Sequence, residues 1–422
     1  MWTRRSLVLA AGAMPVARSL AAQRPSTTSA PTAPPPPAAA STFPDKASFA
    51  PTDITYLDSG SYHPISRGAR AAIESYLARR ALEPVASQQP GVDDAAVLAK
   101  FARLVNVDPE EVTFVQSTTT GEQMVLRALG IPRSGGHIVT DTLHFFGSFP
   151  LYEELARQGM EVTWVRARDG RIHLQDIEAA VRRDTKLIAL SKVSTFNGFE
   201  HDLKAVCDIA HARGAYVYAD VIHAAGCIPL DLHASGVDFA ACASYKWLMG
   251  DFGLGFLYAR KDVQPKLQRT NYGYYALDNF KTHVYPMDPP GDSVADYTFK
   301  DNATGAFALG THGEVVLAQL DYSLDYILNT GVERIQAHAR TLTSRLKTEL
   351  PQRGYTLLTP PESATPLVAF LLPDARNKLS ARLKEEKIRM TLNHNHCRVS
   401  ISVFNSSDDI DHLLSLLGRR PI

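Results

Sequence analysis

Short apolar runs alternate with amphipathic stretches along this chain from residue 56 onward. Buried strands that alternate with surface helices are typical of an α/β domain with a largely parallel sheet. Seven segments read as strands: 112–115, 137–140, 161–165, 187–191, 216–219, 239–243 and 255–258. Four segments between them have helical spacing: 121–128, 150–158, 174–182 and 203–213. We therefore predict an α/β fold in which a large domain holds a mainly parallel seven-stranded sheet.

The C-terminal third has a different pattern. Residues 271–300 are rich in tyrosine, proline and glycine and lack periodicity, so we expect a long loop or a domain crossover there. Helical spacing returns over 313–350, and the end of the chain has two strand-like segments, 367–371 and 399–403, and two helix-like segments, 381–386 and 408–417. A chain of 422 residues also exceeds one simple core. We predict a large domain over 46–300 and a smaller C-terminal α/β domain over 301–422.

The first 45 residues have the composition of a targeting segment and a linker. Arg4 and Arg5 precede an apolar run from Leu7 to Val16, and small residues follow, which predicts a twin-arginine-type signal peptide over 1–22. The run is shorter than the roughly 20 residues that span a bilayer, so we expect no stable membrane anchor. Residues 23–45 are rich in proline and alanine and are predicted to be a linker. The predicted location is periplasmic or secreted.

Charge and cysteine content narrow the class of partner. Lysine plus arginine and aspartate plus glutamate both number 44, so no overall field attracts nucleic acid, and we expect a small-molecule substrate. The four cysteines are Cys207, Cys227, Cys242 and Cys397. They form no CxxC pair and no metal-ligand spacing, so we expect buried thiols and no metal site, while the disulfide state stays open.

Reactive side chains stand at the ends of two predicted strands. One strand runs to Asp220, with His223 three residues later, and the other runs to Lys246. Because parallel strands present ligand-binding groups at their carboxyl ends, these residues are expected to face one crevice. A lysine can hold an aldehyde cofactor as a Schiff base while a carboxylate keeps its pyridine ring protonated. Upstream, the hydroxyl residues 117–120 open a helix, where a phosphate can bind, although such clusters are often simple caps.

The order of these residues resembles the class V aminotransferases, the fold-type I pyridoxal-phosphate enzymes that include cysteine desulfurases and isopenicillin N epimerase. The similarity runs from about Tyr56 to the C-terminus. It implies the fold-type I transferase fold, pyridoxal 5′-phosphate as cofactor and an amino acid as substrate. It also implies that the substrate displaces Lys246 to form an external aldimine, and that the freed lysine then moves the α-proton.

The resemblance implies roles for further residues around the cofactor. Thr118 and Thr119 match the family's phosphate-binding threonines, and Gln123 matches a position often filled by asparagine. His144 matches the residue that stacks on the pyridine ring. Asp220 and His223 match the partners of the ring nitrogen and the ring oxygen, respectively.

The same comparison assigns roles to further residues. Thr311 matches a threonine that reaches the phosphate in the other subunit, which implies a homodimer. Arg398 matches the arginine that binds the substrate carboxylate through a two-pronged contact. Thr195 stands where the family often has an asparagine beside the cofactor oxygen, and Asn197 is a candidate substitute.

Departures from the family pattern narrow the range of reactions that we predict. Cysteine desulfurases of this group carry their nucleophile on a loop before the arginine, whereas residues 392–396 contain no cysteine. We therefore predict an epimerase or racemase, a β-lyase or an aminotransferase. Ala243 and Tyr245 replace the usual serine and histidine before Lys246, which keeps open the alternative of a catalytically retired dimer that acts as a binding protein. A nucleotide-binding Rossmann enzyme is disfavoured because no GxGxxG follows the first strand.

Overall fold

The computed structural model describes residues 42–49, 53–82 and 91–419. The predicted signal peptide and most of the predicted linker lie outside these residues. All of these described residues belong to one compact unit. Within the described ranges, no helix has the length and apolar content needed to cross a membrane.

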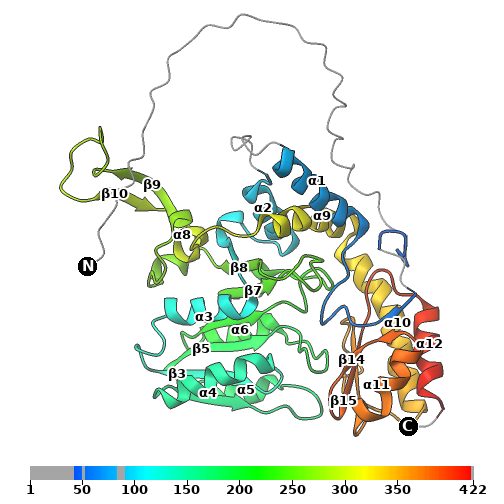
Figure 1. The fold of residues 1–422 in the computed structure, drawn as a ribbon. Coiled ribbons are helices and arrows are strands. Elements are labelled where there is room, and N and C mark those ends of the chain that lie inside the picture. Colours follow the sequence, from blue (N-terminus) through cyan, green and yellow to red (C-terminus); the bar gives the residue numbers. More distant parts are fainter. Residues whose placement is uncertain (1–41, 50–52, 83–90, 420–422) are drawn as a thin grey trace, which may run out of the picture. The chain divides into compact units, whose positions relative to one another are not determined.

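A seven-stranded sheet forms the centre of the large part of this unit (Figure 1). In spatial order its strands are β2 (Val112–Val115), β8 (Gly255–Ala259), β7 (Phe239–Ala243), β6 (Tyr216–Asp220), β5 (Thr185–Ser191), β3 (His137–Asp141) and β4 (Glu161–Val165). The pairs from β7 to β4 are parallel, and β8 is antiparallel to both neighbours. The predicted seven strands and mainly parallel sheet are confirmed.

Alternate residues of the strands enter two separate cores, one on each face of the sheet. In β5, Ile188 and Leu190 join one core, while Leu187 and Ala189 join the other. The first core contains side chains from α2 (Asp94–Leu104), α5 (Leu174–Ala180), α6 (Leu203–His211), α7 (Leu232–Ser235) and α9 (Glu314–Thr330). The second contains side chains from α3 (Thr118–Ala128), α4 (Phe149–Arg157) and α8 (Ala303–Phe307).

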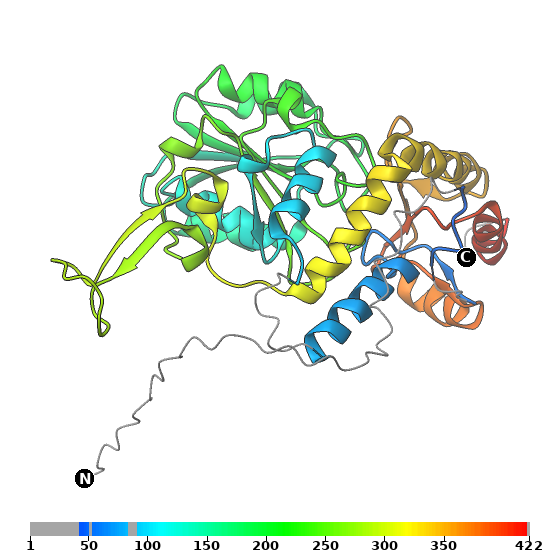
Figure 2. The same cartoon turned by 90° about the horizontal axis from the view of Figure 1, so that it is seen from above.

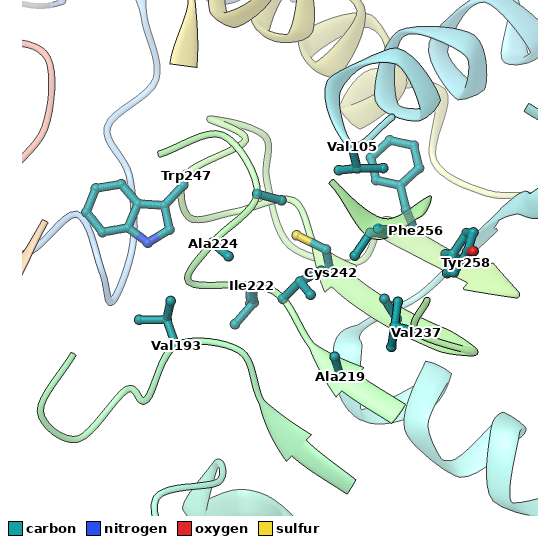
Figure 3. Close-up of a cluster of buried hydrophobic side chains, with 14 of the residues drawn as sticks. Val105, Val193, Ala219, Ile222, Ala224, Val237, Cys242, Trp247, Phe256 and Tyr258 are labelled. Atoms are coloured by element: carbon teal, nitrogen blue, oxygen red, sulfur yellow. The ribbon is translucent and has the colours of Figure 1, made fainter. Parts of the chain in front are cut away.

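The first core extends to the turns that carry the predicted site. Figure 3 shows Cys242 and Ala219 at the strand ends, with Ile222 and Trp247 from the turns that follow β6 and β7. Trp247 is 2% exposed. The predicted Schiff-base lysine is its neighbour in sequence, so the turn that carries this lysine is fixed by the core.

The small part is built on a four-stranded antiparallel sheet. Its order is β11 (Thr356–Leu357), β12 (Leu367–Leu371), β15 (His396–Ser400) and β14 (Thr391–Leu392). Its core is completed by α10 (Val332–Gln352), α11 (Ala375–Glu385) and α12 (Ser407–Leu417). The segment before the large sheet joins this part, because β1 (Thr55–Tyr56) pairs with β13 (Ile388–Arg389) and Leu57 is buried in the same core. The division at residue 300 stays a prediction.

The remaining described helical elements are one α-helix and the 3-10 turns. Helix α1 (Arg67–Leu82) packs against α9. The described 3-10 turns are Pro109–Glu111, Phe146–Ser148, Gln264–Lys266 and Tyr274–Ala276.

The expectation of a loop over 271–300 was wrong. The segment contains an antiparallel hairpin, β9 (Leu277–Thr282) with β10 (Ala295–Phe299), which extends away from the sheet in Figures 1 and 2. Most of its side chains are exposed, so its strands lack the buried apolar face that a sequence pattern detects.

Other elements differ from their predicted bounds. The helical stretch expected over 313–350 consists of two helices, because Gly331 takes φ +86° between α9 and α10. In addition, α11 begins six residues before the predicted 381 and β15 begins three before the predicted 399, since their first residues are mostly polar.

Candidate active site

Lys246 lies in the turn that follows β7, where its side chain is 6% exposed. Its Nζ is 2.9 Å from Nε2 of His223, which follows β6. Burial, and then the positive charge of Arg398, lower the pKa of Lys246 to about 8. A lysine with this pKa is partly neutral near neutral pH, and the neutral amine is the nucleophile and base.

The hydrogen bonds of His223 favour the neutral form of this lysine. The Trp247 indole donates its N–H to Nδ1 of His223 at 3.2 Å, so Nδ1 carries no proton. Burial lowers the pKa of His223 well below its ordinary value, so the ring is neutral and its single proton lies on Nε2. An ammonium group has no lone pair to accept that proton, whereas a neutral amine has one. The 2.9 Å contact is therefore suited to a neutral Lys246.

Asp220 ends β6, which lies between β5, whose last residue is Ser191, and β7, which precedes the turn of Lys246. Its Oδ1 accepts from the Ile222 backbone N–H at 2.9 Å, and its Oδ2 lies 3.5 Å from Ser191 Oγ. Burial raises the pKa of Asp220, against the opposing effects of the Ile222 N–H, His144 and Lys246. The structure thus brings Asp220, His223 and Lys246 together at one edge of the sheet, as the sequence predicts.

His144 follows β3 and is joined to Asp220 by a buried chain of side chains. Its Nδ1 is 2.9 Å from Ser191 Oγ, and its Nε2 is 2.9 Å from Oε1 of Glu122. Glu122 lies on α3, is 2% exposed, and also accepts from Ser148 Oγ and Tyr152 OH, both at 2.6 Å.

Glu122 is a site residue that the sequence analysis missed. The comparison with the family pointed to its neighbour Gln123, but the Gln123 side-chain oxygen accepts from Arg127 along the helix at 3.4 Å. Glu122 lies one turn after Thr118, on the buried face of α3. A lone carboxylate on the apolar face of a helix is the signal that could have identified it, because buried carboxylates need partners.

The N-terminus of α3 is fixed against the turn of Lys246. Ser117 caps the helix by accepting from the Thr120 N–H at 3.1 Å, and Thr118 Oγ1 accepts from the Ala243 N–H at 2.9 Å. The Thr118 hydroxyl proton remains available, and the first backbone N–H groups of a helix have no partner within the helix. Thr118 and the half-buried Thr119 are therefore placed where a phosphate can bind.

Arg398 comes from β15 in the small part and reaches the same site. Its Nη1 donates to Thr195 O at 2.8 Å and to Thr195 Oγ1 at 2.7 Å, and Thr195 Oγ1 lies 3.1 Å from His223 Nε2. Its Nη2 donates to the hydroxyls of Ser61 and Thr391, at 2.7 and 2.9 Å.

The Arg398 charge is only weakly compensated. The Asp58 carboxylate lies 3.9 Å away, and Nε has no hydrogen-bond partner among the described residues. Burial lowers the pKa of Arg398. A buried guanidinium in this state favours an anionic ligand such as a carboxylate.

Besides Gln123, two predicted residues are not brought into this group. Asn197 is buried, but its amide nitrogen donates to Gly170 O and Leu358 O, and its oxygen accepts from the Phe199 N–H. The prediction that Asn197 replaces the family's asparagine beside the cofactor oxygen is therefore corrected. The Asn197 amide links backbone segments instead, and the side chain near His223 is the Thr195 hydroxyl. Thr311 is exposed, and its predicted contact is with a second subunit.

All four cysteines of the chain are buried and free. Cys397 lies in the core of the small part, on the opposite face of β15 from Arg398. Burial raises the pKa of Cys397 and of Cys207 to about 12.

The sequence model of the family described as Aminotransferase class-V matches residues 94–413. The chain belongs to this family. A curated relative, a probable cysteine desulfurase from Methanothermobacter thermautotrophicus, is 29% identical over 248 residues, which are 58% of each chain. The matched part thus spans little more than half of that relative.

Solved structures show the same fold at low sequence identity. The cysteine desulfurase CsdA (S-sulfonic acid) from Escherichia coli has a TM-score of 0.75 at 18% identity, and the match covers 88% of this chain and 96% of that chain. A C-DES mutant with glycine covalently linked to its PLP cofactor has a TM-score of 0.74 at 21% identity, covering 87% and 96%. The predicted fold type I is confirmed.

The family makes this chain a pyridoxal-phosphate-dependent enzyme. The residues present fit the cofactor: Lys246 is a partly neutral buried amine, Asp220 is a buried carboxylate for a protonated ring nitrogen, and α3 offers hydroxyl and N–H donors.

Proposed function

We propose that the enzyme acts on an amino acid by moving the proton of its α-carbon, as an epimerase or racemase, a β-lyase or an aminotransferase. The observation that carries this proposal is the contact between a partly neutral buried Lys246 and His223, in one site with Arg398. The low pKa suits Lys246 both to bind the cofactor aldehyde and to act as a base near neutral pH.

Each neighbouring side chain has a separate task in this proposal. When bound, pyridoxal 5′-phosphate supplies an electron sink for the charge left on the α-carbon. Asp220 holds the ring nitrogen, and Thr118 and Thr119 bind the phosphate. Arg398 binds the substrate carboxylate and thereby orients the α-carbon toward Lys246, whose amine takes the proton and returns it.

The proposal leaves out sulfur transfer through a loop cysteine. Burial of all four thiols supports this, and so does the absence of cysteine from residues 392–396. The relatives named cysteine desulfurases argue against this, and the curated one from Methanothermobacter thermautotrophicus is 29% identical. The products of turnover must therefore show which of these reactions the enzyme catalyses.

The test is incubation of the cofactor-loaded protein with L- and D-amino acids, followed by detection of inverted enantiomer, keto acid, pyruvate and sulfide. We expect turnover by the wild type and by Cys397→Ser, and none by Lys246→Ala. Sulfide release that depends on Cys397 would contradict the proposed branch. Cofactor binding without turnover of any amino acid would favour the retired binding protein.

We also propose that the enzyme is a homodimer in which Thr311 reaches the phosphate of the other subunit. The exposure of Thr311 supports a contact outside its own chain. Sedimentation should show a dimer, and mixing Lys246→Ala with Thr311→Arg under exchange conditions should restore one intact site per dimer. A monomer with full activity would rule this out.

A further inference from the structure

The Glu122 carboxylate lies at one end of a buried chain of polar groups. Its two oxygens accept from two hydroxyls, those of Ser148 and Tyr152, and Oε1 also faces His144 Nε2. Burial raises the pKa of Glu122, but the charge and hydrogen bond of His144, together with the hydrogen bonds from Ser148 and Tyr152, outweigh burial, so the pKa is lowered. Since an ionised carboxylate only accepts, His144 Nε2 must carry a proton.

The other ring nitrogen of His144 faces Ser191. The Ser191 hydroxyl is the donor in its 3.5 Å contact with Asp220 Oδ2, so its oxygen has lone pairs left to accept from His144 Nδ1 at 2.9 Å. A proton on Nδ1 as well as Nε2 makes the ring an imidazolium. The charged groups that face this ring are Glu122, Asp141 and Asp220, all acidic.

We propose that Glu122 is a positioning residue that holds His144 doubly protonated, with its Nδ1–H directed through Ser191 toward Asp220. Burial opposes a charged ring, but Glu122 and the other two carboxylates outweigh it, and the pKa of His144 is raised. The charge on His144 in turn lowers the pKa of Asp220 and offsets part of the cost of burying that carboxylate. The Glu122 charge itself raises the pKa of Asp220, so Glu122 supports the ionised Asp220 only through the charge it maintains on His144. This consequence for the ring nitrogen rests on the proposed function, whereas the charge of His144 does not.

The experiment is ¹⁵N NMR of the imidazole nitrogens across pH 6 to 9, with the His144 signals assigned by their loss in His144→Gln. Glu122→Gln keeps the size of the side chain and removes its charge. Glu111→Gln is the matched control, because Glu111 is also a buried carboxylate, 6% exposed, and accepts from the Lys261 N–H without contacting His144. The measurement needs no cofactor, so failure of the proposed function would not alter its result.

We expect two protonated ring nitrogens on wild-type His144 at pH 7, and the same in Glu111→Gln. In Glu122→Gln the pKa of His144 should fall by at least about one unit, a tenfold change in protonation. When pyridoxal 5′-phosphate is added, the pH midpoint of its absorbance should differ from the wild type in Glu122→Gln and should not differ in Glu111→Gln. A neutral His144 in the wild type at pH 7, or an unchanged titration in Glu122→Gln, would overturn the inference. If Glu122→Gln does not fold, the wild-type spectrum alone still shows whether His144 is doubly protonated at pH 7.

Discussion

Lys246 should be in its reactive, neutral form near neutral pH to a far greater extent than an ordinary lysine. Its pKa falls from the ordinary 10.5 to about 8 because its ammonium form is buried and faces Arg398. At pH 7.5 about a quarter of such amines are neutral, against about one in a thousand for an ordinary lysine. The neutral fraction is therefore larger by roughly 200-fold.

The assay is brief acetylation of the cofactor-free protein at pH 6 to 11, with each lysine quantified by peptide mass spectrometry. Burial slows access equally at every pH, so the midpoint of the pH profile, and not the absolute rate, reports the pKa. We expect a midpoint near pH 8 for Lys246, and a higher midpoint in Arg398→Met, which lacks the second cause of the shift. A wild-type midpoint near 10.5 would refute a buried, partly neutral amine.

Further predictions concern stability, thiol reactivity and export. In the cofactor-free protein, Lys246→Met should be more stable than the wild type at pH 7 by about 3 kcal/mol, from a shift of 10.5 to about 8 at 1.36 kcal/mol per unit. The unfolded chain binds more protons than the native state between these two pKa values, so the penalty is complete below pH 8 and fades toward 10.5. Thermal unfolding at pH 7 and pH 10 should show this gap closing, and a gap independent of pH would contradict it. The four thiols should stay unreactive to a disulfide reagent at pH 8 until the protein is unfolded, since all are buried; a fast-reacting native thiol would reopen the desulfurase branch. Replacing Arg4 and Arg5 with lysine should retain the full-length protein in the cytoplasm, and export of this variant at the wild-type level would count against a twin-arginine signal.

The sequence predicts those parts of the fold that have a strong local signal. Most strands of the large sheet are short apolar runs because both of their faces are buried, as Leu187 and Ile188 illustrate by entering opposite cores. The β9–β10 hairpin has no buried face, so no such run marks it. The break at Gly331 was also missed, since a single glycine is tolerated within a helical pattern.

The site was predicted as far as order along the chain can specify it. Asp220, His223 and Lys246 lie close together because neighbouring parallel strands end at the same edge. Partners that depend on side-chain direction were not predictable: Glu122 points inward to His144, while the adjacent Gln123 bonds along its helix. The sequence also does not reveal that the Asn197 side-chain amide is already hydrogen-bonded to backbone carbonyls.

The most direct test of the central claim is to trap the cofactor on its lysine. The purified protein would be incubated with pyridoxal 5′-phosphate, reduced with borohydride, digested and mapped by mass spectrometry. We predict one phosphopyridoxyl group per chain, on Lys246, and its loss in Lys246→Ala. A protein that takes up no cofactor, or carries it on another lysine, would contradict the assignment of Lys246.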